Sequence, residues 1–400
     1  MPSTRLPALT GIRAVAALSV CLTHAAFWTG NYTDDYPGRL FARCEVGVAI
    51  FFALSGYLLF TPWVRAARAG GPAPSALRYL WHRARRILPA YWITVLAVYV
   101  IYALVPPGGV GSVTGNGVSG LLRQLTLTQV YGIGHLHSGL TQMWSLAAEV
   151  AFYLALPPLG WVMWTTCRRR GAQAWRPDLL IAMLSALLLI SPLWIIVVSG
   201  SAGISPTARL WAPSFLGWFV GGMLLAACAP FLGRLDPRVW VGTAAAALVV
   251  SATEIAGEPT ITPTTASATI VKHVLYLVIA LGLLAPLVGG APSWWSRCLA
   301  NRPMVVLGEI SYELFCVHVI VLEFMMAALG YRVFTGNVVI AFLVTVAVSV
   351  PIAWMLHAAL RVIAAPRPRP PGGSVPAGRM GRAESSTDHR NPAGGGHRAG

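Results

Sequence analysis

The chain has 400 residues, of which 56% are hydrophobic and only 10% are charged, and its formal net charge at pH 7 is +16. A soluble globular protein carries roughly 25% charged residues. The composition therefore excludes an ordinary soluble enzyme and predicts an all-α polytopic membrane protein. The basic residues are divided among loops between apolar segments, which argues against nucleic acid as a partner and favours contact with anionic lipid at the bilayer surface.

Ten apolar segments are long enough to cross the hydrocarbon core, which takes about 20 residues. Each is expected to be a helix, because a helix satisfies its own backbone hydrogen bonds in lipid. In chain order the expected spans are Ala8–Trp28, Val46–Val64, Ile87–Val105, Met143–Trp164, Leu179–Ser199, Trp211–Pro230, Val239–Ile255, His273–Gly289, Met304–Ala327 and Val338–Val362.

The positive charges predict the orientation of these spans. If the ten spans alternate, most of the 29 lysines and arginines fall in loops on the side of the N-terminus. Loops rich in Lys and Arg stay in the cytoplasm, so both termini are expected to be cytoplasmic. The longest loop on the other side, Pro106 to Gln142, is expected to hold a short amphipathic helix.

Domain organisation follows from the same pattern. Residues 1–365 are expected to form one membrane domain, and residues 366–400 a disordered cytoplasmic tail rich in Pro, Gly and Arg. The six cysteines lack the spacing of a metal site, so neither a bound metal nor a disulfide is predicted.

The first span contains two ionisable residues, Arg13 and His24. They are eleven residues apart, or three turns plus about 20°, so they share one helix face about 16 Å apart. Ionisable residues inside a membrane usually face a cavity and serve a function. The alternative is structural, with Arg13 reaching the cytoplasmic headgroups and His24 joining two helices.

Other spans carry possible partners for this histidine. Glu149, in "MWSLAAEVAFYLALP", is expected at a depth similar to that of His24, where it would orient the imidazole as a general base or form a structural ion pair. In "FFALSGYL", Ser55 and Tyr57 are candidates to hydrogen-bond a substrate or an oxyanion. The alternative there is close helix packing at Gly56.

Arg83 and Arg86 lie three residues apart, just before the third span. Together with Arg13 at the same membrane level they would form a phosphate-binding mouth, whereas topological anchoring is the simpler interpretation of each. The ninth span holds Tyr312 and His318 among several polar residues, which favours a helix that lines a cavity. A hydrogen-bonded core histidine is the alternative for His318.

Taken in order, these segments resemble the acyltransferase-3 family of multi-pass membrane O-acyltransferases. The resemblance rests on Arg13 and His24, "FFALSGYL", Arg83 and Arg86 before "ILPAYW", "WSLAAE" ending at Glu149, and "ISYELFCVH" ending at His318. The sequence departs from the common family pattern at four places. Thr10 and Ala49 stand where acidic residues are usual, Val150 where a second Glu is common, and Val319 and Ile320 where an aromatic residue and Pro follow the histidine.

The resemblance implies transfer of an acyl group from cytoplasmic acyl-CoA, acetyl-CoA first among the candidates, to a hydroxyl of a carbohydrate, glycolipid, cell-envelope polymer or glycosylated metabolite. No bound cofactor is expected. The excess of arginine over lysine suggests a GC-rich bacterial genome, and thus a bacterial plasma membrane. The implied site comprises catalytic His24 and Glu149, donor-binding Arg13, Arg83 and Arg86, and the polarising or cavity-lining residues Ser55, Tyr57, Trp144, Ser145, Tyr312 and His318.

A multi-pass transporter or exporter of a small molecule or glycolipid is the main alternative, because buried charge in several spans would suit it. Transporter folds often contain internal repeats. The sequence shows no convincing repeat, so the enzyme is the favoured interpretation.

Overall fold

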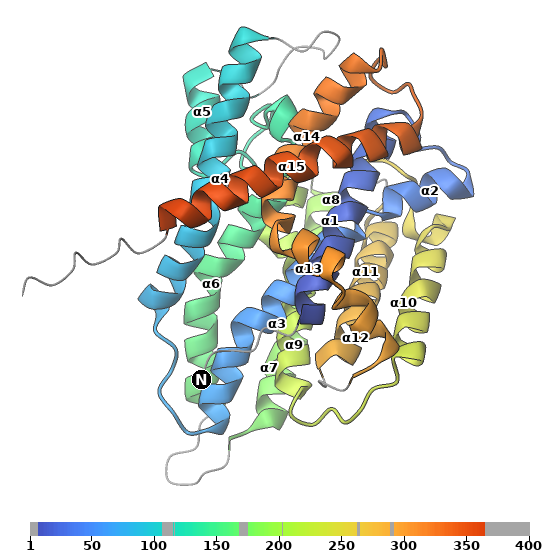
Figure 1. Cartoon of the computed structure of the whole chain (residues 1–400). Helices are drawn as coiled ribbons and strands as arrows, with labels where there is room; N and C mark the ends of the chain where they lie inside the picture. Colours follow the sequence, from blue (N-terminus) through green and yellow to red (C-terminus); the bar gives the residue numbers. More distant parts are fainter. Residues whose placement is uncertain are drawn as a thin grey trace, which may run out of the picture. The chain divides into compact units, whose positions relative to one another are not determined.

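The computed structural model describes residues 7–105, 115, 117–167, 175–201, 203–261, 265–288 and 292–364. The expected tail, 366–400, lies outside the described residues. Within them the regular structure is helical and contains no β-strand (Figure 1). The first α-helices are α1 (Pro7–Trp28), α2 (Tyr36–Arg43), α3 (Val46–Arg68), α4 (Ala76–Leu104), α5 (Gly117–Leu125), α6 (Met143–Cys167), α7 (Pro177–Leu188) and α8 (Ile190–Gly200). They are followed by α9 (Ala212–Cys228), α10 (Pro237–Ser251), α11 (Ala266–Val288), α12 (Trp294–Leu299), α13 (Arg302–Glu309), α14 (Ser311–Ala328) and α15 (Val338–Ala364).

Nine helical segments in the described part of the chain are long and apolar enough to cross a membrane. Nine of the ten expected spans correspond to them. The other, Val239–Ile255, corresponds to α10, whose 15 residues end at Ser251 and extend only about 22 Å. This helix packs along α11, which is one of the nine. The expected helix in the long loop is confirmed as α5, although 106–114 and 116 lie outside the described residues.

The ninth expected span, Met304–Ala327, is wrong as a single helix. The structure interrupts it at Ile310, between α13 and α14. The Ser311 hydroxyl donates to the carbonyl of Gly308 at 2.9 Å, a local bond that competes with the helical pattern. Hydropathy could not reveal the break, because apolar residues continue on both sides of it. Leu179–Ser199 is likewise two helices, which meet at Leu189.

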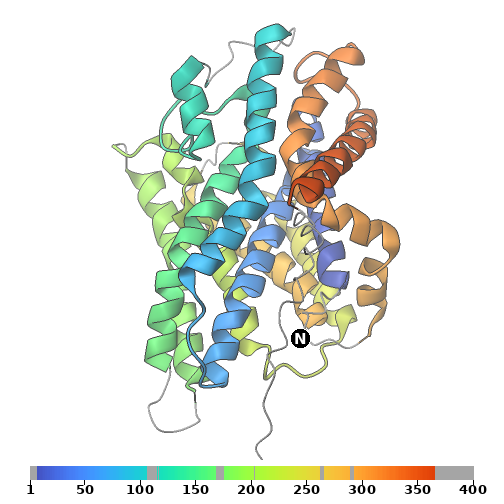
Figure 2. The same cartoon turned by 60° about the vertical axis from the view of Figure 1, so that its left-hand side comes forward.

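Helix α3 lies at the centre of the bundle and packs against α1, α6, α9 and α11 (Figures 1 and 2). Glycines bring its backbone against that of α9. A Cβ on Gly56 would lie 2.0 Å from the carbonyl oxygen of Phe219, and one on Gly222 only 1.8 Å from that of Ala53. Small residues of this kind let helices in a membrane approach closely. The packing interpretation of Gly56 is therefore confirmed.

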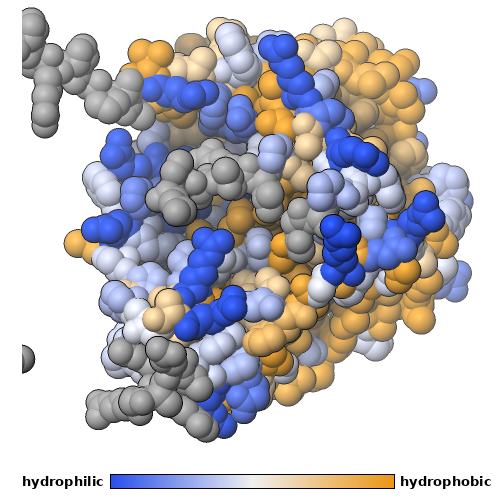
Figure 3. Space-filling view, turned by 60° about the horizontal axis from the view of Figure 1, so that its bottom comes forward, coloured by the Kyte–Doolittle hydropathy of each residue, from blue (hydrophilic) through white to orange (hydrophobic). Residues whose placement is uncertain are grey.

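The surface of the bundle separates into an apolar flank and a polar end. Large apolar side chains such as Leu96, Leu154 and Leu193 are exposed, as expected of residues that face lipid. We refer to the two ends of the bundle by helix α3, which begins at the Val46 end and finishes at the Arg68 end. Figure 3 brings the Arg68 end forward and shows hydrophilic residues gathered over it.

Replacing Gly56 by alanine tests the contact between α3 and α9. The new methyl group would overlap the Phe219 carbonyl, so we expect a loss of about 1–3 kcal/mol of stability. The matched control is Gly242→Ala in α10, where a Cβ would meet open space and alanine should stabilise by about 0.5–1 kcal/mol. The measurement is the apparent Tm in detergent at one scan rate. Equal shifts for the two variants would contradict the packing argument.

Candidate active site

A carboxylate joins helices α3 and α6 near the middle of the bundle. Glu149 in α6 accepts hydrogen bonds at one oxygen from the Ser55 hydroxyl of α3, at 2.8 Å, and from the Tyr153 hydroxyl one turn along α6, at 2.5 Å. Ser55 therefore uses its proton to hold Glu149. Both bonds end on the same oxygen, so Ser55 and Tyr153 hold the carboxylate in place.

Three arginines surround this carboxylate. Arg13 of α1 interacts electrostatically with Glu149 and with Arg83 and Arg86 of α4. The Nε of Arg83 is buried and has no hydrogen-bond partner. Three guanidinium groups thus gather near the carboxylate of Glu149, and we call these arginines the arginine cluster. Such a site is suited to a polyanion, and arginine forks match phosphate oxygens.

Two tyrosines of this cluster were missed in the sequence. Tyr153 holds Glu149, and Tyr79 lies one turn before Arg83 and interacts electrostatically with both Arg83 and Glu149. The Tyr79 hydroxyl is buried without a hydrogen-bond partner, which is costly unless a further polar group completes the site. The signal available in the sequence was spacing, since each tyrosine stands four residues from a charged residue on the same helix face.

Two histidines from helices distant in sequence meet in a second cluster. Nε2 of His318 in α14 lies 3.2 Å from Nδ1 of His24 in α1, with the ring centroids 5.0 Å apart. Nδ1 of His24 also lies 2.8 Å from the Val20 carbonyl, and Nδ1 of His318 lies 2.8 Å from that of Phe315. We call these residues the histidine pair.

The carbonyls fix the tautomers of the pair. A carbonyl oxygen can only accept, so each Nδ1 carries a hydrogen. Nε2 of His318 then accepts from the Nδ1–H of His24, which is shared with the Val20 carbonyl, and in the neutral ring Nε2 of His24 is left with its lone pair free. No hydrogen bond from a described residue reaches that nitrogen. An oriented imidazole with a free nitrogen is the arrangement required of a general base.

The structure does not bring His24 and Glu149 together as expected. Among the contacts of the described residues, Glu149 is associated with Ser55, Tyr153 and Arg13, and His24 with His318. The segment before α6 explains the difference, because it enters the bundle. The Gln142 amide donates to the Cys316 carbonyl of α14 at 3.0 Å. Helix α6 therefore begins inside the bundle rather than at its edge, and Glu149, about two turns further along, reaches the level of Arg13.

The other expected site residues are tied to their surroundings. Tyr312 lies within electrostatic range of Glu149, and its hydroxyl donates to the Ile87 carbonyl at 3.0 Å. The Ser145 hydroxyl donates to the Gln142 carbonyl, the half-buried Trp144 packs on Phe215, and Tyr57 is half-buried on α3. In the described residues no three His, Cys, Asp or Glu side chains are grouped so as to hold a metal ion.

Comparison with known proteins places the chain in a family. The family model described as "Acyltransferase domain" matches residues 6–356. The chain belongs to this acyltransferase-3 family. Together with the nine apolar helices, this makes it a multi-pass membrane protein of that family and confirms the resemblance seen in the sequence.

Each of the following relatives matches only part of the chain. It is 26% identical over 253 residues to "Peptidoglycan O-acetyltransferase OatA" of Listeria monocytogenes, across 58% of this chain and 35% of that protein. It is 30% identical over 165 residues to "Acyltransferase MdmB" of Streptomyces mycarofaciens, across 38% of each. It is 27% identical over 188 residues to "Nodulation protein 10" of Rhizobium leguminosarum, across 40% of this chain and 46% of that protein. The matches thus span less than half the length of each relative. No solved structure matches the chain.

The segment before α6 contains a histidine whose titration should affect stability. His137 is fully buried between Tyr99 and Tyr102, and its Nδ1 accepts from the Gly139 amide at 3.2 Å. Burial lowers the pKa of His137 to about 4, below the ordinary value near 6.5. The folded protein therefore holds the neutral ring, and the stability this contributes is complete above about pH 6.5 and is lost as the pH falls toward 4.

We expect the apparent Tm of the wild type to fall more between pH 6.5 and pH 4 than that of His137→Asn, which keeps an acceptor at the same place but cannot titrate. The measurement is a series of thermal melts of both proteins in one detergent across this range. Parallel pH dependence of the two proteins would show that His137 is not responsible.

Proposed function

We propose that the protein is a membrane O-acyltransferase that moves an acyl group from acyl-CoA to a hydroxyl of a carbohydrate-containing acceptor. The observation that carries the proposal is the free Nε2 of His24, oriented by Val20 and His318, on the same helix as one arginine of an anion-binding cluster. Membership of the acyltransferase family supports the reaction class.

His24 acts as the general base in this proposal. Its Nε2 takes the proton of the acceptor hydroxyl as the oxygen attacks the thioester carbonyl carbon. The tetrahedral intermediate then collapses, the carbon–sulfur bond breaks, and the imidazolium returns the proton to the departing CoA thiolate. The Nδ1–H of His24, held by the Val20 carbonyl and His318, keeps the ring oriented through both proton transfers.

The arginine cluster receives the donor. CoA carries phosphates, and the buried, unpartnered Nε of Arg83 beside Arg13 offers donors to them. Most of the basic loops lie at the Arg68 end, which argues that this end faces the cytoplasm. Acyl-CoA is available in the cytoplasm. Glu149 keeps the guanidinium groups in place through Coulomb attraction while Ser55 and Tyr153 hold Glu149 itself.

The acceptor is inferred from orientation and from relatives. With the Arg68 end in the cytoplasm, the Val46 end faces outward, and a hydroxyl at that end belongs to an extracytoplasmic or membrane-borne molecule. The name of the Listeria relative points to peptidoglycan as one such carbohydrate. We propose a bacterial plasma membrane as the setting.

Replacing His24 by alanine should lower the transfer rate by about 10²–10⁴, the usual contribution of a general base. His318→Gln should lower kcat less while leaving the KM for donor unchanged, because it removes only the orienting acceptor. Purified protein in detergent with labelled acetyl-CoA and N-acetylglucosamine oligosaccharides provides the measurement. His82→Ala, at an exposed position of α4, is the control. Normal transfer by the His24 variant would rule out the general-base assignment.

Arg83→Gln should weaken binding of the donor, because a phosphate loses a charge-assisted hydrogen bond, and we expect the dissociation constant of CoA to rise about 10- to 100-fold. Arg85→Gln is the matched control on the same helix, since Arg85 is exposed and lies over Trp81. CoA binding by titration calorimetry measures both. If Arg83→Gln binds CoA like the control, Arg83 serves only to anchor α4.

A further inference from the structure

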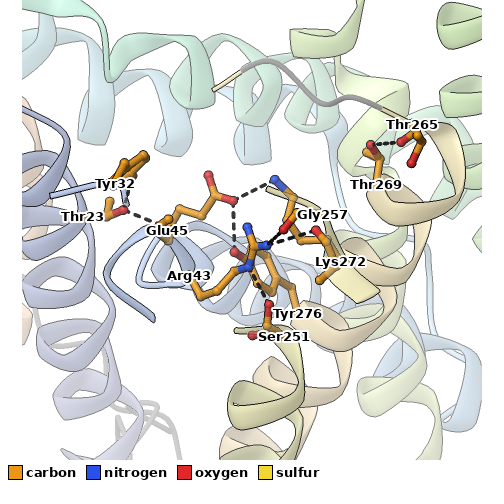
Figure 4. A network of polar contacts seen from close by, with 12 residues as sticks. Thr23, Tyr32, Arg43, Glu45, Ser251, Gly257, Thr265, Thr269, Lys272 and Tyr276 are labelled. Carbon is orange, nitrogen blue, oxygen red and sulfur yellow. Dashed lines mark hydrogen bonds and ion pairs between the residues drawn. The ribbon is translucent and has the colours of Figure 1, made fainter. Parts of the chain in front are cut away.

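A carboxylate at the Val46 end is held by groups from another helix. One oxygen of Glu45, just before α3, accepts from the Lys272 ammonium at 2.9 Å and from the Tyr276 hydroxyl at 3.0 Å, both in α11 (Figure 4). The other oxygen of Glu45 makes no hydrogen bond to a described residue. The Glu45 side chain is 40% exposed, and that of Lys272 is 15% exposed. Lys272 is the single lysine of the chain.

The backbone around this ion pair is fixed by a buried arginine. Arg43, 1% exposed, donates to the carbonyls of Ser251 at 2.6 Å, Ala256 at 3.1 Å and Gly257 at 2.5 Å (Figure 4). It thereby ties α2 to the connection between α10 and α11. Glu45 follows two residues later and has little freedom to move away from Lys272.

Helix packing places Glu45 and His24 on the same side of the contact between α1 and α3. The two helices are antiparallel and meet at Gly47, where a Cβ would lie 2.3 Å from the Ala16 carbonyl oxygen and 2.9 Å from the Val20 side chain. His24 lies one turn beyond Val20 toward the Val46 end, on the Val20 face of α1, and Glu45 lies two residues beyond Gly47 in the same direction. The two side chains interact electrostatically.

The free atoms of the ion pair match the chemistry of a sugar. The second oxygen of Glu45 accepts hydrogen bonds, and the Lys272 ammonium has three hydrogens of which one is used on Glu45. Each hydroxyl of a polyol donates one hydrogen bond and accepts others, so adjacent hydroxyls can bind both partners. The half-buried Tyr32, bonded to Thr23 at 2.6 Å, borders Glu45 with an aromatic ring (Figure 4).

We propose that Glu45 and Lys272 form the acceptor subsite, which binds adjacent hydroxyls of a carbohydrate and presents one of them to His24. This proposal rests on the proposed acyltransferase function and deepens it. In this view Glu45 is an acceptor-binding residue, and Arg43 and Tyr276 are positioning residues that hold it.

The test separates acceptor binding from donor chemistry. In Glu45→Gln the glutamine oxygen still accepts from Tyr276 but the charge is lost, so the KM for N-acetylglucosamine tetrasaccharide should rise about 10- to 100-fold. The KM for acetyl-CoA and its slow hydrolysis without acceptor should stay within about twofold. Lys272→Met should act in the same direction, and it probes the subsite from α11 if the Glu45 variant does not fold. Glu254→Gln, an exposed carboxylate of the α10–α11 connection, is the control.

A direct measurement of sugar binding tests the subsite independently of the transfer reaction. Calorimetry with the tetrasaccharide should show binding to the wild type and about 10- to 100-fold weaker binding to Glu45→Gln, whether or not acetyl-CoA is consumed. If the wild type binds the sugar but transfers nothing, the proposed function fails and the subsite stands. Equal binding by wild type and variant, absence of binding to both, or a loss confined to kcat would overturn the carbohydrate subsite.

Discussion

The hydrogen bond from the His24 Nδ1–H to the Val20 carbonyl determines much of the chemistry that the bundle can perform. In a low-dielectric interior a polar hydrogen without a partner is costly, so the imidazole uses its proton on its own helix. The second nitrogen is then left as a base. His318 repeats the arrangement with Phe315, and its Nε2 shares the Nδ1 hydrogen of His24 with the Val20 carbonyl. A second imidazole therefore provides the orientation for which a carboxylate is often used.

Most of the arginine cluster could be predicted from the sequence. Arg13, Arg83 and Arg86 lie close to the starts of the first and third predicted spans, and spans that begin on the same side of the membrane place such residues at one level. The sequence predicts Glu149 at the depth of His24, because depth can be counted only from the edge of an apolar segment, whereas its contacts in the structure are with Ser55, Tyr153 and Arg13. The segment that precedes α6 enters the bundle and bonds through Gln142 to α14, and hydropathy carries no information about such a contact.

The helices themselves were predicted well, and their interruptions were not. Ser311 and Gly308 break the ninth span, yet serine and glycine also occur inside straight membrane helices, where they serve packing. Gly56 and Gly308 are both such residues, since a Cβ on Gly308 would lie 1.9 Å from the carbonyl oxygen of Thr10. A closely packed glycine therefore stands inside the straight α3 and also beside the break before α14, and the residue type alone does not distinguish the two places. The importance of His318 was hidden for a similar reason, since its partner lies 294 residues away in the chain.

The register of α1 against α3 connects the two clusters. In antiparallel helices the rise per residue is equal and opposite, so contact of Val20 with Gly47 sets His24 near Glu45 and sets Arg13 near Ser55. The second pairing agrees with independent contacts, because Ser55 bonds to Glu149 and Glu149 interacts with Arg13. A shift of one turn between the helices would move both pairings by about 5 Å. Because Gly47 and Gly56 seat α3 against α1 and α9, the small residues of one helix fix the separation between the cationic cluster and the base.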